Sequence, residues 1–123
     1  MEKLLIERTK STPAIQFDPE TGSLEISGES YPEDAAMFYR PVTEWLKEYL
    51  AGSDTPIEFN VRMIYLNTSS TKCFMNFFDI LEDAYEDGRE LKVNWYYNTE
   101  NEIALECGEE FKEDLSIPFH ILS

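Results

Sequence analysis

The sequence predicts a small α/β sandwich, in which a mainly parallel mixed sheet starts with an N-terminal hairpin and carries helices between the later strands. Two observations lead to this fold class. Short apolar segments suited to strands alternate with segments whose apolar residues recur every three or four positions. With 123 residues, 42% of them hydrophobic, the chain has material for one core and little for a second. We therefore expect a single domain over residues 1–123, with the order ββαβαβαβ.

The first predicted element is a hairpin. Residues 13–17 and 23–27 have the composition of short strands, and the second of them alternates apolar and polar positions. The connection between them contains Pro19 and Gly22, which suit a tight turn. These features predict two antiparallel strands at the start of the fold.

A helix is expected next. Ser30 and Glu33 match a capping box, in which the two side chains satisfy free amides at a helix start. The apolar pattern continues to about Leu50, and Gly52 ends it. Pro41 interrupts the pattern because proline donates no hydrogen bond and clashes with the preceding turn, so we expect a kink or two helical pieces.

The middle of the chain predicts a central strand followed by the clearest helix. Residues 56–66 become nearly continuous in apolar side chains, as expected of a strand buried on both faces. The helix predicted over residues 69–87 ends at Gly88. Its apolar residues follow the spacing of one helical face and lie at positions 73, 74, 77, 78, 81, 84 and 85.

The last third of the sequence repeats the alternation of strand and helix. Residues 91–97 predict a strand, and Thr99 and Glu102 form a second capping box that opens a helix to about Asp114. Residues 117–122 predict a final strand. Helices between successive strands imply right-handed crossovers and a mainly parallel sheet.

The strong negative charge of the chain limits its partners. Ten Lys and Arg against 25 Asp and Glu give a net charge of −15. Such a surface repels nucleic-acid phosphates and anionic lipid head groups over about 8–10 Å, so we expect neither as a partner. The start of the sequence has only a short apolar run, residues 4–6, and no membrane-spanning run follows. We expect a cytoplasmic protein in which Cys73 and Cys107 stay reduced.

Sequence signatures of the common enzyme classes are absent. The chain contains no GxGxxG, GxxxxGK[ST], GxSxG or HExxH pattern, so it lacks the parts for dinucleotide, nucleotide, esterase-type or zinc chemistry. The only histidine, His120, has apolar neighbours in the last predicted strand, which favours a pairing or core role over general-base catalysis. We therefore predict no catalytic residue, no metal site and no cofactor.

A run of hydroxyl residues marks the junction between the central strand and the clearest helix. Thr68, Ser69, Ser70 and Thr71 follow Asn67 directly. A helix N-terminus presents free amides and about half a positive charge, so it can hold an added phosphate. Phosphate adds a charge of about −1.5 to −2, enough to repel an acidic partner or disrupt an apolar contact while the fold persists. The pattern is compatible with a phosphorylation switch, whereas the cluster taken alone favours an ordinary N-cap, because Ser and Thr are common at that position.

This helix start also lacks a carboxylate of its own. The other two main helices are predicted to carry Glu33 and Glu102 at the third helical position. Counting from Thr68 as the cap places Thr71 at that position and Lys72 next. The sequence therefore predicts a vacant anion site at this helix end.

At this junction the sequence resembles two kinds of regulatory protein. Its length, its α/β pattern and the hydroxyl after a central strand are similar to the STAS domains of anti-sigma factor antagonists. The chain more closely resembles the SiaC family of bacterial regulatory phosphoproteins. The stretches that carry this resemblance are residues 11–15 (STPAI), 30–33 (SYPE), 65–72 (YLNTSSTK), 95–98 (WYYN) and 108–114 (GEEFKED).

The resemblance to the SiaC family implies a STAS-like fold and a non-enzymatic partner-switching function. It implies phosphorylation by a dedicated serine/threonine-type kinase and dephosphorylation by a PP2C-type phosphatase. The unphosphorylated form would bind and activate a diguanylate cyclase in cyclic-di-GMP signalling.

The family's phosphorylated threonine corresponds to Thr68. Ser69 is the alternative acceptor, because sporulation-type antagonists carry their serine in an Asp-Ser-Ser-Gly motif. This chain departs from that motif, with Asn67 in place of Asp and no glycine after the hydroxyls, which favours the SiaC interpretation.

The partner-binding surface is expected at the start of the same helix. Its predicted residues are Asn67, Thr68, Ser69, Ser70, Thr71 and Lys72. Met75, Asn76 and Asp79 recur at helical spacing further along, although a methionine at such a position is typical of core filling.

A small enzyme or ligand-binding domain is the alternative function. It would use carboxylates together with Tyr65, Tyr96 or Tyr97 at the carboxyl ends of the strands, where open α/β sheets place their ligands. Buried tyrosines whose hydroxyls reach a polar partner are the structural alternative for these rings.

Overall fold

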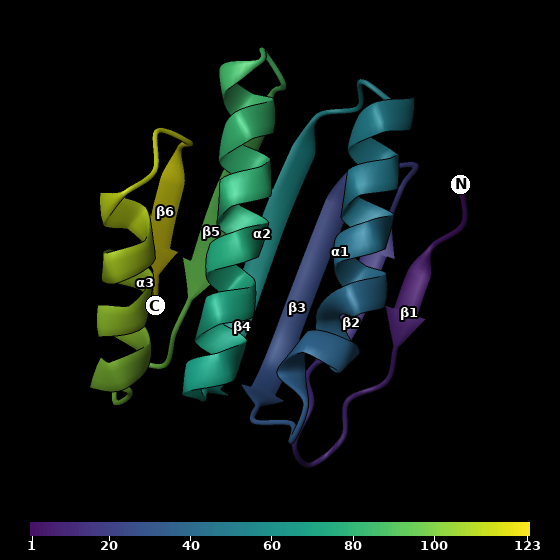
Figure 1. Ribbon diagram of the computed structural model, residues 1–123. Helices are drawn as coiled ribbons and strands as arrows, with labels where there is room; N and C mark the ends of the chain where they lie inside the picture. The colour runs from purple at the N-terminus through teal and green to yellow at the C-terminus, as the bar shows by residue number, and fades with distance from the viewer.

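Six strands and three helices follow one another along the chain (Figure 1). The computed structural model describes residues 1–123. The strands are β1 (Leu4–Ile6), β2 (Ala14–Asp18), β3 (Ser23–Ser30), β4 (Ile57–Leu66), β5 (Leu91–Tyr96) and β6 (Phe119–Leu122). The helices are α1 (Ala35–Gly52), α2 (Thr68–Glu86) and α3 (Glu102–Glu113). The predicted order is confirmed, with β1 added before it.

The strands form one mixed sheet in the order β1-β2-β3-β4-β5-β6. β1, β2 and β3 are antiparallel, and β3 to β6 are parallel. The mainly parallel sheet and the N-terminal hairpin are therefore confirmed. The sequence did not reveal β1, because a strand of three residues is too short to show a period.

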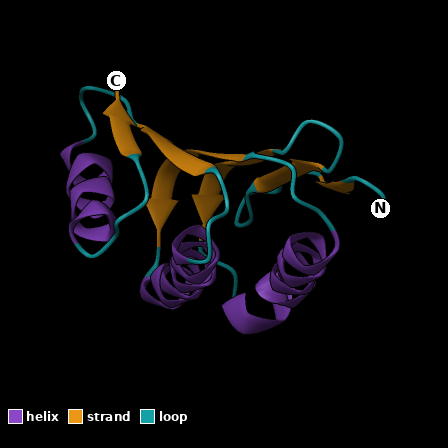
Figure 2. Ribbon diagram, turned by 90° about the horizontal axis from the view of Figure 1, so that it is seen from above, coloured by secondary structure: helices purple, strands orange, loops and turns teal.

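All three helices lie on one face of the sheet (Figure 2). Each parallel strand pairs with the next one in the sequence, so right-handed crossovers carry every helix to the same side. The expectation that residues 56–66 are buried on both faces is therefore wrong. Side chains of β4 alternate between the helical face and an open face, where Arg62 pairs with Glu25 at 3.0 Å and Lys92 with Glu58 at 3.7 Å.

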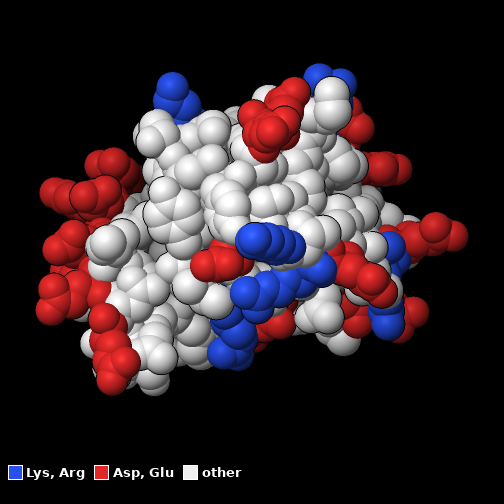
Figure 3. Space-filling model, turned by 90° about the horizontal axis from the view of Figure 1, so that it is seen from below, with Lys and Arg blue, Asp and Glu red and all other residues white.

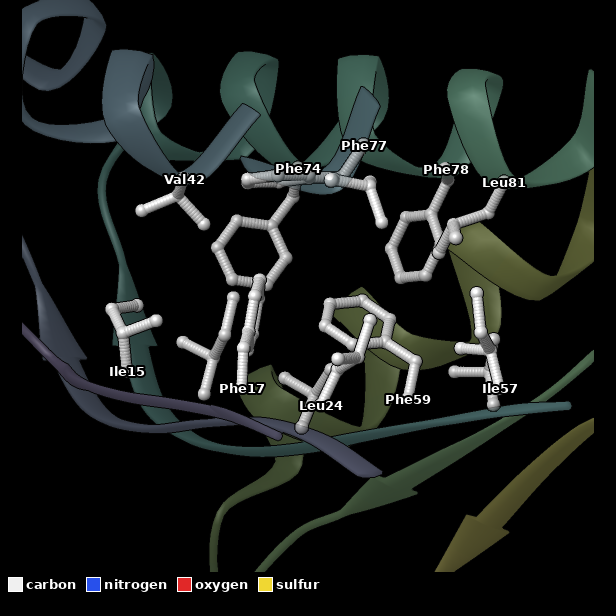
Figure 4. Packing of buried hydrophobic residues seen from close by; sticks show 14 of the residues in the cluster. Ile15, Phe17, Leu24, Val42, Ile57, Phe59, Phe74, Phe77, Phe78 and Leu81 are labelled. Carbon is white, nitrogen blue, oxygen red and sulfur yellow. The ribbon is translucent and has the colours of Figure 1, made fainter. Parts of the chain in front are cut away.

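Aromatic side chains fill the space between the sheet and the helices (Figure 4). From α2, Phe74, Phe77, Phe78 and Leu81 point toward the sheet, where Phe59 is one of the residues they face. Burial of each such side chain stabilises the fold by about 1.5–3 kcal/mol. This packing fixes α2 against β4 and so fixes the position of the helix start.

The core under α3 is built around an indole ring. Trp95 is fully buried, and its Nε1 donates a hydrogen bond to the Ala104 carbonyl oxygen at 2.9 Å. Gly108 lets α3 approach this ring closely, because a Cβ at this position would lie 2.6 Å from the indole Cδ1. The close approach explains a glycine in the interior of a helix.

The helices begin at different residues from those expected. Asp34 caps α1 and Asn101 caps α3, so both predicted capping boxes are wrong. Ser30 instead ends β3 and is buried, and Thr99 lies in the preceding turn. A Ser/Thr-x-x-Glu match is a local pattern, and long-range contacts decide which residue becomes the cap. α1 runs through Pro41 as one helix instead of two pieces.

The structure decides the expectations about the histidine and the two cysteines. His120 is exposed, so the expected core role is wrong, although it pairs in register with Asn94 in the sheet. Cys73 and Cys107 are free. Burial and the neighbouring Glu110 raise the pKa of Cys107 to about 11, and burial and Asp34 raise the pKa of Cys73.

None of the three helices is both long enough and apolar enough to cross a membrane.

Candidate functional site

The hydroxyl cluster lies where α2 begins, at the carboxyl end of β4. Asn67, not Thr68, is the N-cap, and its Oδ1 accepts a hydrogen bond from the Ser70 amide at 2.9 Å. The Asn67 amide donates to the Ser30 carbonyl oxygen at 2.9 Å, which ties the helix start to the end of β3. The predicted position of the cluster is confirmed, and the predicted cap shifts by one residue.

The hydroxyl side chains of this first turn differ in their surroundings. Ser70 is buried, and Thr71 donates to the Asn67 carbonyl oxygen at 3.0 Å. Ser69 is exposed and reaches Asn67 Oδ1 at 3.5 Å. Thr68 is exposed, and its hydroxyl takes part in no hydrogen bond within the chain. The Thr68 hydroxyl is therefore accessible and is the only one of the cluster that is free of hydrogen bonds within the chain.

A buried chain of three hydroxyls supports the first turn from below. Ser30 Oγ lies 2.7 Å from Tyr39 Oη and 2.7 Å from Ser70 Oγ, which joins β3, α1 and α2. The side chains are at most 2% exposed, so water does not satisfy these groups. Burial raises the pKa of Tyr39 above its ordinary value despite the hydrogen bond with Ser30, so this phenol stays protonated.

A backbone irregularity in β3 brings Ser30 to this position. The register between β3 and β4 shifts after Gly28, so that Glu29 lies opposite Tyr65 and Ser30 opposite Leu66. Gly28 has a φ of 121°, a conformation that glycine adopts without steric cost.

The first turn of α2 carries no acidic residue, which confirms the predicted absence of a carboxylate. The contrast with the other helices is weaker than expected, however. The first turn of α1 also lacks an acid, because Glu33 precedes that helix, while Glu102 is the first residue of α3. The amides of Thr68 and Ser69 have no acceptor in the chain, and Lys72 is exposed one turn further on.

Sequence reasoning missed an exposed apolar group beside the hydroxyls. Tyr31, Ile64, Tyr65 and Ile103 are 37%, 48%, 47% and 71% exposed. The rings of Tyr31 and Tyr65 lie 6.2 Å apart between centroids. Figure 3 views this end of the molecule and shows a neutral area crossed by basic side chains and flanked by acidic ones.

Strand lengths explain why these apolar residues are uncovered. β5 pairs with β4 only as far as Arg62, whereas β3 pairs with it to Leu66. The residues of β4 after Arg62 therefore project beyond β5, and Ile64 and Tyr65 lack a neighbouring strand on that side. In the sequence, such an unpaired strand end is indicated where one predicted strand is longer than the strand that follows it, as β4 with 10 residues is longer than β5 with 6.

Of the tyrosines of the alternative function, Tyr65 lines only a small hollow, and neither Tyr96 nor Tyr97 lines any of the main hollows of the surface. Tyr65 lies on the surface, and the Arg62 guanidinium carbon sits 3.8 Å above the ring centre of Tyr96. The hollow beside the end of β4 has a volume of about 30 Å³, and all its lining side chains are hydrophobic. No three His, Cys, Asp or Glu residues gather as a metal site. This end of the sheet therefore resembles a contact surface more than a ligand pocket.

Comparison with known proteins places the chain in a family. Residues 6–123 match the model of the SiaC family regulatory phosphoproteins. The chain belongs to the SiaC family. A protein of Pseudomonas aeruginosa strain UCBPP-PA14, described as uncharacterized, is 44% identical over 121 residues, covering 98% of this chain and 96% of the relative.

Two solved structures extend the likeness to the SiaC fold. The crystal structure of apo-SiaC from Pseudomonas aeruginosa is 42% identical, covers 100% of both chains and gives a TM-score of 0.96. A crystal structure of the diguanylate cyclase SiaD in complex with its activator SiaC, from the same organism, matches with 44% identity and a TM-score of 0.93. That match covers 97% of this chain and 98% of the other. The mixed α/β fold expected from the sequence is the SiaC fold, whereas the finer likeness to STAS domains stays a prediction.

In this SiaC-family chain we expect the N-cap of α2, Asn67, to contribute measurably to the stability of the fold. The variant Asn67→Ala is expected to lower the free energy of unfolding by about 1 kcal/mol, because the Ser70 amide loses its acceptor. Urea unfolding followed by tryptophan fluorescence measures this change. Asn67→Asp is the control, since aspartate caps as well as asparagine and should keep most of the stability. Equal stability of the alanine variant and the wild type would contradict the capping role.

Proposed function

We propose that this chain is a non-enzymatic partner-switching protein, with residues 1–123 acting as one STAS-like domain. Its unphosphorylated form binds and activates a diguanylate cyclase. Reversible phosphorylation at the start of α2 ends that contact, with a serine/threonine-type kinase and a PP2C-type phosphatase as the opposing enzymes. Support comes from membership of a regulatory phosphoprotein family and from the relative SiaC, which occurs in complex with the cyclase it activates.

Thr68 is the acceptor in this proposal, and the observation that carries it is the freedom of its hydroxyl. The side chain is exposed at the first helical position and has no hydrogen-bond partner to give up. Ser69, the alternative, is exposed but interacts with the capping residue at 3.5 Å. A kinase needs a hydroxyl that it can reach and reorient, which favours Thr68.

The first turn of α2 tolerates the added phosphate. Free amides at Thr68 and Ser69, the positive end of the helix and the absence of a nearby acid all favour an anion there. Lys72 follows at i+4, on the same helix face. The fold therefore survives phosphorylation, and the modification acts on the surface.

The contact surface in this proposal combines the first turn of α2 with the exposed apolar group. Tyr31, Ile64 and Tyr65 supply area that a partner can bury, and Thr68 lies three residues beyond Tyr65. A phosphate with a charge of about −1.5 to −2 beside that area brings a strongly hydrated group into the interface. Its desolvation then opposes binding even where no acidic partner residue is near.

The first experiment maps phosphate in protein isolated from its native host. Cleavage after Arg62 and Lys72 releases residues 63–72, which contain all the hydroxyls of the cluster. Mass spectrometry before and after treatment with a PP2C-type phosphatase is expected to find one removable phosphate, on Thr68. A phosphate on Ser69 would move the acceptor by one residue, and no phosphate under any growth condition would contradict the switch.

The second experiment measures binding to the diguanylate cyclase of the same host. Phosphorylation at Thr68 is expected to weaken binding by more than about tenfold and to lower cyclic-di-GMP production, since buried like charges and unpaired charges cost several kcal/mol. Thr68→Ala should bind but resist the kinase, and Ser69→Ala is the control that keeps both behaviours. Equal binding of the phosphorylated and unphosphorylated forms would refute the proposed switch.

A further inference from the structure

A groove between α1 and α2 gathers basic side chains that have no acidic partner. The two helices run side by side in the same direction (Figures 1 and 2). The groove has a volume of about 410 Å³, and its charged lining residues are Arg40, Lys47, Lys72 and Glu44. Only two ion pairs occur in the structure, and none of these three cations takes part in them. We call this feature the basic groove.

The charge of the basic groove differs from that of the rest of the molecule. It holds three of the ten Lys and Arg residues and one of the 25 Asp and Glu residues. In four further hollows of the surface, the acids equal or outnumber the bases. A hollow between the later turns of the same two helices, for example, is lined by Asp54, Asp83, Asp87 and Glu90 with Lys47 and Arg89. Lys47 lines both hollows, whereas Arg40 and Lys72 line only the basic groove, where bases outnumber acids.

The helices themselves add to this local potential. Neither α1 nor α2 has an acid in its first turn. Within the first turn of each helix, no carboxylate therefore offsets the positive end of the helix dipole. Asp34, the N-cap of α1, is the only carboxylate among the two caps, and it accepts a hydrogen bond from the Met37 amide at 3.0 Å. Cys73 at the edge of the groove stays protonated, because burial and Asp34 raise its pKa.

We propose that the basic groove receives an acidic segment of a protein partner, and that phosphate on Thr68 weakens this contact by engaging Lys72. The second clause rests on the proposed function. Lys72 lies one turn after Thr68 on the same helix face, so a phosphate and the ammonium group meet as an i, i+4 pair. One of the three cations of the groove is then neutralised by the modification.

A carboxylate-bearing polypeptide fits this groove better than a nucleotide does. No aromatic face is available for a base, because Tyr39, the only ring in the lining, is 2% exposed. No glycine lines the groove, so no glycine-rich loop is present to wrap a phosphate. The overall charge of −15 repels long polyanions, whereas contacts within about 8 Å are governed by the local cations.

A peptide titration tests the groove without any assumption about the natural partner. A synthetic peptide of eight Glu-Ala repeats is added to the full-length protein, and amide chemical shifts are followed by NMR. Shift changes are expected along the facing sides of α1 and α2, around Arg40, Lys47 and Lys72. The double variant R40E/K47E should lose them, and phosphorylation at Thr68 should weaken them. The control K112E makes a charge reversal on α3, outside the groove, and should keep them.

The same variants separate this inference from the proposed function. If the cyclase binds the wild type, R40E/K47E is expected to weaken binding by about tenfold while K112E changes it little. Cyclase binding that is unchanged by R40E/K47E would overturn the basic groove and leave the phosphorylation switch standing. If the unphosphorylated wild type does not bind the cyclase, the proposed function is refuted, and the peptide titration alone then tests whether the basic groove binds an acidic segment. Shift changes that lie outside the groove, or that R40E/K47E retains, would then overturn the inference.

Discussion

The variant Phe78→Ala is expected to lower the free energy of unfolding by about 3–5 kcal/mol. Phe78 is 2% exposed and sits where sheet, α2 and α3 meet. Its ring centre lies 5.8 Å from that of Phe59, 4.9 Å from Phe111 and 5.7 Å from Phe119. Alanine removes the transfer energy of the ring and leaves a cavity that rigid aromatic neighbours fill poorly, so both contributions add.

Urea unfolding followed by tryptophan fluorescence measures this effect. Met75→Ala is the control on the same helix, because Met75 is 53% exposed and its loss should change stability by less than about 0.5 kcal/mol. The exposure also shows that the expected core-filling role of Met75 is wrong. A Phe78→Ala variant as stable as Met75→Ala would contradict the packing described for this helix.

The variant Ser30→Ala is expected to cost about 2–4 kcal/mol, because it leaves two buried hydroxyls without a partner. Tyr39 Oη and Ser70 Oγ each lie 2.7 Å from Ser30 Oγ. Each unsatisfied buried polar group costs about 1–3 kcal/mol, far more than a surface serine contributes. The lost hydrogen bond between Ser30 and Ser70 lies directly beneath the first turn of α2, so we also expect lower local stability in the region that carries Thr68.

A double-mutant cycle distinguishes this mechanism from a simple loss of packing. Ser30→Ala combined with Tyr39→Phe removes two hydroxyls of the chain together, and the combined cost should be smaller than the sum of the single costs. Ser27→Ala, on the same strand and in no side-chain hydrogen bond, is the control and should be near neutral. Amide hydrogen exchange at residues 70–72 should become faster in Ser30→Ala. Additive costs and unchanged exchange would refute the coupling.

Local patterns in the sequence were sufficient where one element carries its own signal. The helix predicted over residues 69–87 is α2 at Thr68–Glu86, because five buried positions on one face repeat at helical spacing. The hydroxyl cluster follows the central strand as expected, since the strand and the helix that bound it were both recognisable. The predicted site residues lie together at the start of α2, from its N-cap Asn67 to Lys72, although Ser70 is buried.

Contacts between distant segments decided what local patterns did not. Ser30 matched a capping box, yet it ends β3 because its hydroxyl lies between Tyr39 and Ser70, nine and forty residues away. The open face of the sheet follows from the order of its strands, which no local window contains. The exposed Ile64 and Tyr65 follow from the unequal lengths of β4 and β5.

By itself, the sequence determined the order of strands and helices after β1 and the hydroxyl cluster at a helix start, because each depends on residues close together in the chain. It also determined the acidic character of the protein, because net charge depends on composition alone. The tertiary structure alone decided which hydroxyl is free, which serine is buried and where the few cations gather. The basic groove joins side chains from α1 and α2, with Arg40 and Lys72 far apart in sequence. Charge and hydrogen bonding act through space, so only the folded chain brings such groups within reach of one another.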